Sequence, residues 1–250
     1  MVGVVTHNPM ATLRFELLEQ TVRSIERAFP TAALFLIDNG STDGSWPAVQ
    51  ELLGPKGIAC AECGREQECG RWHTARDTAD PRDNFTPGAG RHRLYYHMFR
   101  HTQNGEHRAP FWVWSDDDMK WKEGAERKLR HFWYEAPPDI VIASGLLEPV
   151  WHWNTPRRVV EAGGVRALVR DSAPGAAWTF REPRDIPVPS NEKMMRFGYD
   201  FESCKLLREH HLLVAQLDLA DHIGWGYSTH GNEANHHVDA RPLDREKWGV

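Results

Sequence analysis

Hydrophobic runs alternate with amphipathic stretches through the first half of the chain. Residues 2–6 (VGVVT) and 33–37 (ALFLI) are β-branched and aliphatic runs typical of buried strands. Between them, apolar residues recur at helical spacing over residues 13–29. A run of turn formers at 38–45 then leads into a second helix, with Ser45 as its N-cap and Pro47 in its first turn. This order of strand, helix, strand, helix predicts a parallel sheet with right-handed crossovers.

A third hydrophobic run, residues 111–115 (FWVWS), passes directly into Asp116, Asp117 and Asp118. Because no core holds three unpaired carboxylates, the acids are expected where the strand reaches the surface. Strand alternation would point Asp116 and Asp118 to one side and Asp117 to the other. Two such oxygen ligands suit Mg²⁺ or Mn²⁺, which commonly hold phosphate oxygens. The alternative interpretation is a solvated turn that caps the strand.

Three polar clusters follow the three predicted strands. They comprise Thr6 to Asn8, Asp38 to Asp43, and Asp116 to Asp118. Since the carboxyl ends of parallel strands meet at one edge of a sheet, where ligands of open α/β sheets bind, we expect the clusters to form one site.

Further elements are predicted along the rest of the chain. Residues 58–61 are a candidate strand, 62–87 a long loop, 123–134 an amphipathic helix, 139–143 a strand, and 212–217 a late strand. Residues 165–170 and 176–181 flank a Pro-Gly turn region and are predicted to pair as an antiparallel hairpin. Arg91, at the start of a helix near 88–99, is a candidate partner for a diphosphate or a solvated helix-start arginine.

Composition is that of an ordinary globular protein: 250 residues, 40% hydrophobic and 26% charged. We expect one domain, residues 1–250, with a first half at about 1–145, a second half at about 146–230 and a tail at 231–250. No apolar run is long enough for a membrane span and no signal peptide is visible, so a cytoplasmic protein is expected. The net charge of −5 gives no general attraction to nucleic acid or anionic membrane.

Four potential zinc ligands lie in and beside the predicted loop: Cys60, Cys63, Cys69 and His73. Their spacing is compatible with a structural zinc site. No second CxxC follows the first, and a reducing compartment tolerates free thiols. We therefore predict that no zinc is tightly bound.

Three segments, in this order, resemble motifs of family-2-like glycosyltransferases with the GT-A fold. They are residues 4–8 (VVTHN), 36–45 (LIDNGSTDGS) and 115–119 (SDDDM), the last resembling the DxD motif. The resemblance covers roughly residues 2–145. It implies that the half at about 1–145 binds a nucleotide sugar and that the half at about 146–230 binds the acceptor. It implies an α/β fold with a GT-A-type, Rossmann-like, mainly parallel sheet flanked by helices, plus an antiparallel hairpin on the acceptor side. It also implies that Asp38 contacts the nucleotide's base or ribose, and that Asp116 and Asp118 meet the ribose and the metal.

The second half matches this family less well. The family places an acidic pair before a helix with a trailing arginine, and residues 197–208 (FGYDFESCKLLR) resemble that segment. Here Tyr199 replaces the first acid, which leaves Asp200 as the implied catalytic base, with Glu202 as the rival. The resemblance also implies His222, after the late strand, as the third metal ligand.

The function implied is a metal-dependent glycosyltransferase that uses Mn²⁺ or Mg²⁺ and a nucleotide-diphosphate sugar. An Asp base would make it inverting, although the residues leave a retaining mechanism open. The acceptor is open among protein, glycan, lipid and modified DNA. The donor-binding candidates are Thr6, Asn8, Asp38, Asp43, Arg91, Asp116 and Asp117, the metal ligands Asp116, Asp118 and His222, and the catalytic residues Asp200 and Glu202.

Two other functions compete with this one. A sugar-nucleotide nucleotidyltransferase shares the sheet and the carboxylate-bound metal, but no glycine-rich phosphate loop follows the first strand. A nucleic-acid-binding module built on the Cys/His loop is disfavoured by the net charge. A hybrid, in which the enzyme glycosylates a modified DNA base, remains an alternative.

Overall fold

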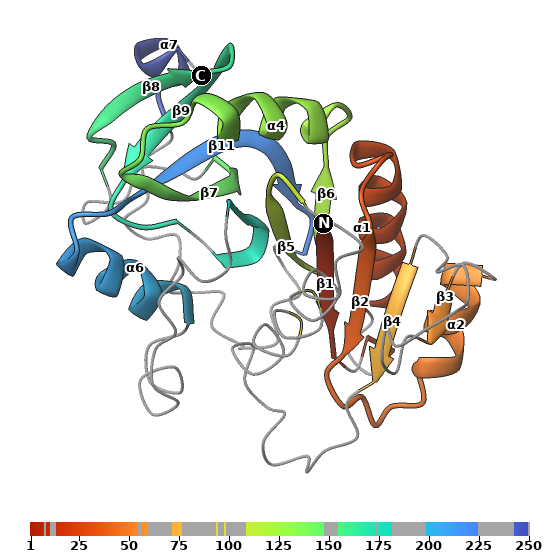
Figure 1. Ribbon diagram of the computed structural model, residues 1–250. Helices are drawn as coiled ribbons and strands as arrows, with labels where there is room; N and C mark the ends of the chain where they lie inside the picture. Colours follow the sequence, from red (N-terminus) through yellow and green to blue (C-terminus); the bar gives the residue numbers. More distant parts are fainter. Residues whose placement is uncertain are drawn as a thin grey trace.

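The computed structural model describes residues 1–7, 9–10, 14–54, 57–59, 72–76, 94, 98, 109–147, 155–173, 175–181, 199–224 and 243–249. Figure 1 shows how the elements are arranged. In chain order they are β1 (Val2–Thr6), α1 (Phe15–Ala28), β2 (Leu34–Asp38), α2 (Trp46–Leu53), β3 (Gly57–Ala59), β4 (Trp72–Arg76), β5 (Trp112–Asp116), β6 (Met119–Trp121), α4 (Ala125–Glu135), β7 (Ile140–Leu146), β8 (Arg158–Ala162), β9 (Val165–Arg170), the 3₁₀ turn η2 (Gly175–Ala177), β10 (Trp178–Phe180), α6 (Tyr199–Glu209), β11 (Leu213–His222) and α7 (Arg245–Trp248).

One mixed sheet connects all the described strands. Its order is β3-β4-β2-β1-β5-β10-β7-β11-β9-β8, and β6 pairs with β11 beside this path. The first five strands in this order, β3-β4-β2-β1-β5, run parallel to one another, as the strand and helix alternation predicts. Beyond β5, β10 runs antiparallel between β5 and β7, whereas β7 and β11 are parallel.

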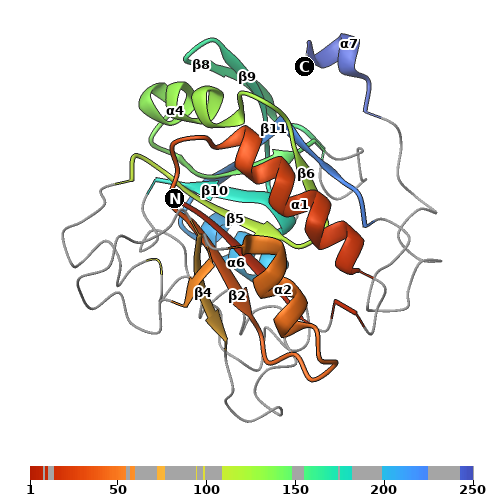
Figure 2. The same ribbon diagram turned by 90° about the vertical axis from the view of Figure 1, so that its right-hand side faces the viewer.

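The sheet separates two apolar layers because successive side chains of a strand point to opposite faces. In β2, Leu34 and Leu36 join one buried cluster, while Phe35 and Ile37 join the other. Helices α1, α2 and α4 pack on the first face and α6 on the second. Figure 2 views the sheet with α1 and α2 in front and α6 behind. The α/β fold with helices on both faces of a sheet is therefore confirmed.

Two sequence predictions about strands are wrong. The predicted loop at 62–87 contains β4, which pairs in parallel with both β2 and β3. Its sequence, WHTAR, is short and half polar, so hydrophobic periodicity does not reveal it. The second error concerns the partner of residues 165–170.

The antiparallel hairpin exists, but it joins β9 to β8 and not to residues 176–181. Gly163 and Gly164 connect the two strands with positive φ angles of 56° and 70°. Two positive φ angles in a two-residue loop are what a tight hairpin turn requires, and glycine adopts them without strain. Residues 178–180 form β10 and lie in the middle of the sheet. Among the helices of the described ranges, none has both the length and the apolar composition needed to cross a membrane.

Candidate functional site

Three predicted polar positions lie together at the carboxyl edge of the central strands. Thr6 is the register partner of Asp38 across β1 and β2, and Val5 is the partner of Asp116 across β1 and β5. The parallel register therefore brings the ends of β1, β2 and β5 side by side, as the strand pattern predicts.

The acidic triplet spans the end of β5 and the turn that follows. Asp116 is the last residue of β5 and is half-buried, whereas Asp117 and Asp118 form the turn into β6 and are 5% exposed each. Helix α1 fixes this turn, because the hydroxyl oxygens of Thr21 and Ser24 accept hydrogen bonds from the backbone amides of Met119 and Trp121, both at 3.0 Å. The edge of β6 is thus paired with helix side chains on one side and with β11 on the other.

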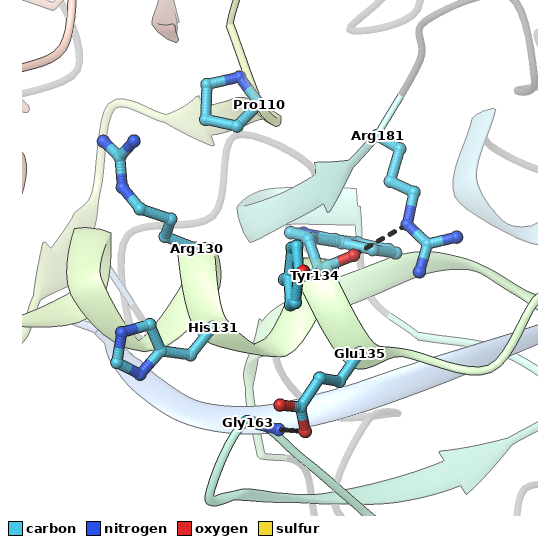
Figure 3. A pocket seen from close by; sticks show the side chains of 8 residues that line it. Pro110, Arg130, His131, Tyr134, Glu135, Gly163 and Arg181 are labelled. Atoms are coloured by element: carbon cyan, nitrogen blue, oxygen red, sulfur yellow. Dashed lines mark hydrogen bonds between the residues drawn. The ribbon is translucent and has the colours of Figure 1, made fainter.

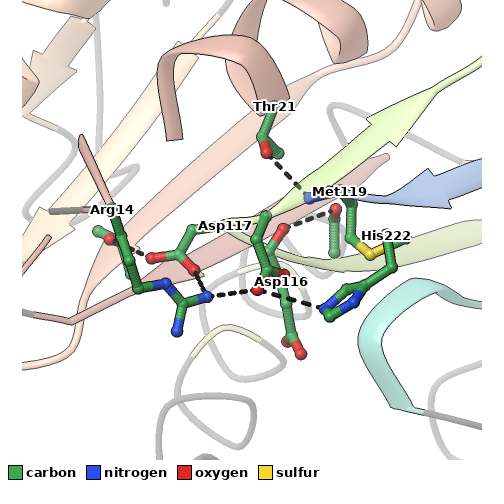
Figure 4. Close-up of polar contacts among 9 residues, drawn as sticks. Arg14, Thr21, Asp116, Asp117, Met119 and His222 are labelled. Atoms are coloured by element: carbon green, nitrogen blue, oxygen red, sulfur yellow. Dashed lines mark hydrogen bonds and ion pairs between the residues drawn. The ribbon is translucent and has the colours of Figure 1, made fainter. Parts of the chain in front are cut away.

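Arg14 lies between two of the three carboxylates (Figure 4). Its Nη2 atom is 2.6 Å from Oδ1 of Asp117 and 2.7 Å from Oδ2 of Asp118. The hydroxyl of Thr6 donates to Oδ2 of Asp117 at 2.7 Å. Asp117 and Asp118 therefore meet on one cation, contrary to the prediction that Asp117 faces away from its neighbours. Strand alternation does not apply here because the chain leaves the strand at Asp116.

The two carboxyl groups that share Arg14 differ in their pKa. Burial raises the pKa of Asp117 to about 7, and the nearby Asp118 and Asp116 add to this, against the opposing effects of Arg14 and Thr6. Burial acts in the same direction on Asp118, but the hydrogen bond and charge of His222, together with Arg14, outweigh it and lower the pKa of Asp118. Asp118 is consequently the more firmly ionised acid of the pair.

His222 reaches Asp118 through the pairing of β6 with β11. His222 is the register partner of Met119, and the backbone amide of Ile223 donates to the carbonyl of Asp118 at 2.9 Å. The Nε2 atom of His222 is 3.3 Å from Oδ2 of Asp118. His222 lies at the end of β11, which is longer than the predicted strand at 212–217.

The carboxylate of Asp118 also lies tightly against the backbone of Gly224. A Cβ atom at Gly224 would be 2.2 Å from Oδ2 and 2.6 Å from Cβ of Asp118. Real Cβ atoms do not approach other atoms this closely. Only glycine leaves room for the carboxylate here.

The donor atoms around Asp118 fit a divalent ion. Oδ1 of Asp118 is buried and has no hydrogen-bond partner among the described residues. Two ligand atoms at about 2.1 Å from an octahedral ion and at right angles to each other are about 3.0 Å apart, close to the 3.3 Å between His222 and Asp118. Within the described ranges, however, no three His, Cys, Asp or Glu side chains gather closely enough to hold an ion. The protein would thus supply two ligands from Asp118 and His222, and Asp116 is not gathered with them.

A second polar cluster lies at the ends of β2 and β4. Asp38 is 1% exposed, and its carboxylate accepts from the Ser41 backbone amide at 3.0 Å and from Nε of Arg76 at 3.1 Å. Arg76 also donates to the Ser41 carbonyl at 2.9 Å. Asp43 lies on the same loop, where it accepts from the backbone amide of Ser45 at the start of α2. The Asp38 loop is therefore held in shape by an arginine of the strand that sequence periodicity missed.

The predicted base and its rival lie on the first turn of α6. Asp200 is half-buried, and its Oδ2 atom accepts from the Gly175 backbone amide of η2 at 3.1 Å. Glu202 is 3% exposed. The turn η2 packs beside β5 and β7, so the bond from Gly175 ties Asp200 to the central sheet. Asp200 is the more accessible of the two acids.

Several predicted residues lie outside the described part of the chain: Asn8, Arg91, Cys60, Cys63 and Cys69. His73 is described, is 4% exposed and stacks on Phe35 with a ring separation of 4.7 Å. This contact gives His73 a packing role in the core.

Sequence reasoning missed Arg14 and Arg76, which hold the two acidic clusters. The signal for Arg14 was its position just before the helix that follows β1, at the edge where three acids need a cation. Arg76 ends β4, and recognising that strand would have placed it beside Asp38.

A cavity of about 740 Å³ lies elsewhere, over the second half of α4 (Figure 3). Its lining comprises Pro110, Arg130, His131, Trp133, Tyr134, Glu135, Gly163 and Arg181. Arg181 donates to the Trp133 carbonyl at 2.9 Å, and Glu135 accepts from the Gly163 amide at 2.7 Å. None of the predicted site residues that the structure describes lines this cavity.

No protein-family model and no curated protein sequence matches the chain. Similar solved structures do exist. TarS of S. aureus has a TM-score of 0.50 at 11% identity, with 86% of this chain and 34% of that chain covered. The mannosyltransferase PcManGT from Pyrobaculum calidifontis, solved with GDP-Man and Mn²⁺, has a TM-score of 0.45 at 15% identity, with 86% and 55% covered.

A nucleoside-diphosphate-sugar pyrophosphorylase from Vibrio cholerae RC9 has a TM-score of 0.48 at 9% identity, with 90% of this chain and 96% of that chain covered. The chain thus spans about half the length of PcManGT and about one third of TarS. At these identities the likeness concerns the fold. The α/β architecture with its central, mostly parallel sheet is that of GT-A-type structures, as the sequence motifs implied.

Proposed function

We propose that this protein is a metal-dependent glycosyltransferase that moves a sugar from a nucleotide-diphosphate sugar to an acceptor hydroxyl. The observation that supports this most directly is the pair formed by Asp118 and His222. Asp118 is firmly ionised, and its buried Oδ1 atom has no hydrogen-bond partner among the described residues. Its Oδ2 atom is 3.3 Å from Nε2 of His222 at the carboxyl edge of the sheet. This is the donor set that a divalent ion beside a diphosphate needs.

The nucleoside end of the donor is assigned to the Asp38 cluster. Asp38 would accept from the base or ribose, and Arg76 and the Ser41 amide keep its carboxylate oriented. The cluster lies on β2 and β4, next to β1 and β5, so a donor lying along this edge would extend its diphosphate toward Asp118. When bound, a divalent ion held by Asp118 and His222 would offset the negative charge on the departing diphosphate.

Asp200 is proposed as the general base. It would take the proton of the acceptor hydroxyl while the oxygen forms a bond to the anomeric carbon. As that bond forms, the bond from the anomeric carbon to the diphosphate breaks, and the nucleoside diphosphate leaves with the bonding electrons. The Gly175 amide fixes the Asp200 carboxylate during this step. One displacement of this kind inverts the anomeric centre.

A panel of nucleotide sugars incubated with the protein and Mn²⁺ or Mg²⁺ tests the proposal. We expect slow release of nucleoside diphosphate from one donor, faster with acceptor, and no release in EDTA. Formation of nucleoside triphosphate from the same donor and pyrophosphate would instead identify a nucleotidyltransferase.

Single substitutions test which residues bind the metal ion and the nucleotide. Asp118→Ala should abolish the metal-dependent thermal shift produced by UDP or GDP, and His222→Ala should only weaken it, because the negatively charged carboxylate ligand remains. Asp116→Ala tests the remaining predicted ligand in the same way. Asp221→Ala is the matched control, since this acid neighbours His222 in sequence but is 60% exposed. An unchanged shift in the Asp118 variant would refute the donor-site assignment.

A further inference from the structure

Arg14 contacts both carboxylates of the acidic turn, Asp117 and Asp118, but has no role in the function proposed above. Its side chain is 12% exposed, and one nitrogen bridges Asp117 and Asp118. Its Nε atom is buried and has no hydrogen-bond partner in the described part of the chain. An arginine in this position is a cation already bound where a metal ion would be expected to bind.

We propose that Arg14 is a placeholder cation: it holds Asp118 in the donor-free protein, opposes divalent-ion binding there, and transfers to the donor's diphosphate when the ion binds. This inference rests on the proposed function. It adds a positioning residue that couples metal binding to nucleotide binding.

Competition between Arg14 and the ion follows from their shared oxygen. Oδ2 of Asp118 is 2.7 Å from Arg14 and 3.3 Å from Nε2 of His222. A carboxylate that accepts a charge-assisted hydrogen bond has less electron density for a metal, and the guanidinium repels a second cation nearby. Arg14 therefore weakens metal binding for as long as it stays on Asp118.

The described residues supply only part of an ion's coordination, so the diphosphate is expected to supply more of it. In the described ranges no third Asp, Glu, His or Cys side chain gathers with Asp118 and His222 to hold an ion. An ion with two protein ligands relies on phosphate oxygens and water for the remainder of its coordination. Metal alone should therefore bind weakly.

Arg14 is suited to exchange one anion for another. It directly precedes α1, its backbone is anchored by a bond to the Pro9 carbonyl at 2.7 Å, and its planar guanidinium can form paired hydrogen bonds with a phosphate. When Arg14 leaves, Asp117 retains the hydroxyl of Thr6. The exchange thus leaves neither buried acid without a polar partner, because Asp118 then holds the ion.

Binding of Mn²⁺ can be measured directly from the electron paramagnetic resonance signal of the free ion, with no need for turnover. For the wild-type protein we expect weak Mn²⁺ binding alone and at least about tenfold tighter binding with one of UDP, GDP, CDP, ADP or dTDP, within the usual range for coupled sites. In Arg14→Gln, Mn²⁺ alone should bind about tenfold more tightly than to wild type, and the nucleotide should increase this affinity much less.

Three further variants complete the experiment. Arg14→Met is a second neutral variant with a similar unbranched stem, and it should behave like the glutamine variant. Arg14→Lys keeps the charge and should retain weak Mn²⁺ binding. Arg23→Gln removes an equal charge from α1, the helix that Arg14 precedes, at a side chain that is 60% exposed, and it should leave both affinities unchanged. Circular dichroism and thermal unfolding verify that each variant is folded.

Two results would overturn the inference while the proposed function stands. In the first, the neutral Arg14 variants bind Mn²⁺ as weakly as Asp118→Ala, which would make Arg14 a scaffold for the carboxylates. In the second, the neutral Arg14 variants bind Mn²⁺ with the same affinities as Arg23→Gln, which would mean that Arg14 does not influence binding of the ion. A wild-type protein that binds Mn²⁺ with none of the nucleotides would instead reject the proposed function, and the inference with it.

Discussion

Substitution of Gly224 by alanine provides a sharp test of the site geometry. The added Cβ would lie 2.2 Å from Oδ2 of Asp118, so the carboxylate or the backbone must move by about 1 Å to reach normal contact. Overpacking of this kind costs about 1–3 kcal/mol. In a chain of this length, 1 kcal/mol lowers Tm by about 2–4 °C, so we expect a decrease of about 4–8 °C for a mid-range cost.

The clash should be specific to one side chain, because the three nearest atoms to the added Cβ all belong to Asp118. In an Asp118→Gly background, Gly224→Ala should therefore have almost no effect on stability. The assay is a double-mutant cycle from thermal or urea unfolding of the four proteins. If Gly224→Ala destabilises both backgrounds equally, the backbone at Gly224 does not approach Asp118 as described.

Three other predictions concern the buried acid, the base and the cysteines. Burial raises the pKa of Asp117 to about 7, so the unfolded chain releases this proton at lower pH than the folded protein. In metal-free buffer, the free energy of unfolding should therefore fall by at most about 4 kcal/mol as the pH rises from about 4 to 7. Asp117→Asn should remove that pH dependence, as measured by urea unfolding. Equal pH slopes in the two proteins would contradict the assignment. Asp200→Asn can still accept from the Gly175 amide but cannot take a proton, so it should bind donor normally and lose transfer by orders of magnitude; loss in Glu202→Gln alone would identify Glu202 as the base. Elemental analysis should find no stoichiometric zinc, and zinc that is lost in Cys63→Ser would prove this prediction wrong.

The strands and the edge that gathers the acids were predictable because both depend on local pattern. Buried runs such as 34–38 and 112–116 are apolar and end in acids, and a parallel register places their ends together. Local sequence alone therefore indicates where these polar residues gather. The roles assigned to Asp200 and to the metal ligands remain predictions.

Contacts between distant segments were not predictable in the same way. Arg14 meets Asp117 across 103 positions of sequence, and no periodicity encodes that approach. The direction of the Asp117 side chain was mispredicted because the strand ends at Asp116, two residues earlier than the alternation assumed. Strand β4 escaped detection because a five-residue strand with polar members has no distinctive period, and Arg76 was missed with it.

The position of β10 determines which pieces of this chain can exist alone. Its three residues separate β5 from β7, and the Thr179 hydroxyl donates to the Ala143 carbonyl at 2.9 Å while accepting from the Trp133 indole at 3.0 Å. A fragment that ends before residue 178 lacks this insert and leaves backbone amides and carbonyls exposed along β5 and β7. Open strand edges of this kind recruit other chains, so such a fragment should aggregate even though it contains every residue of the acidic turn.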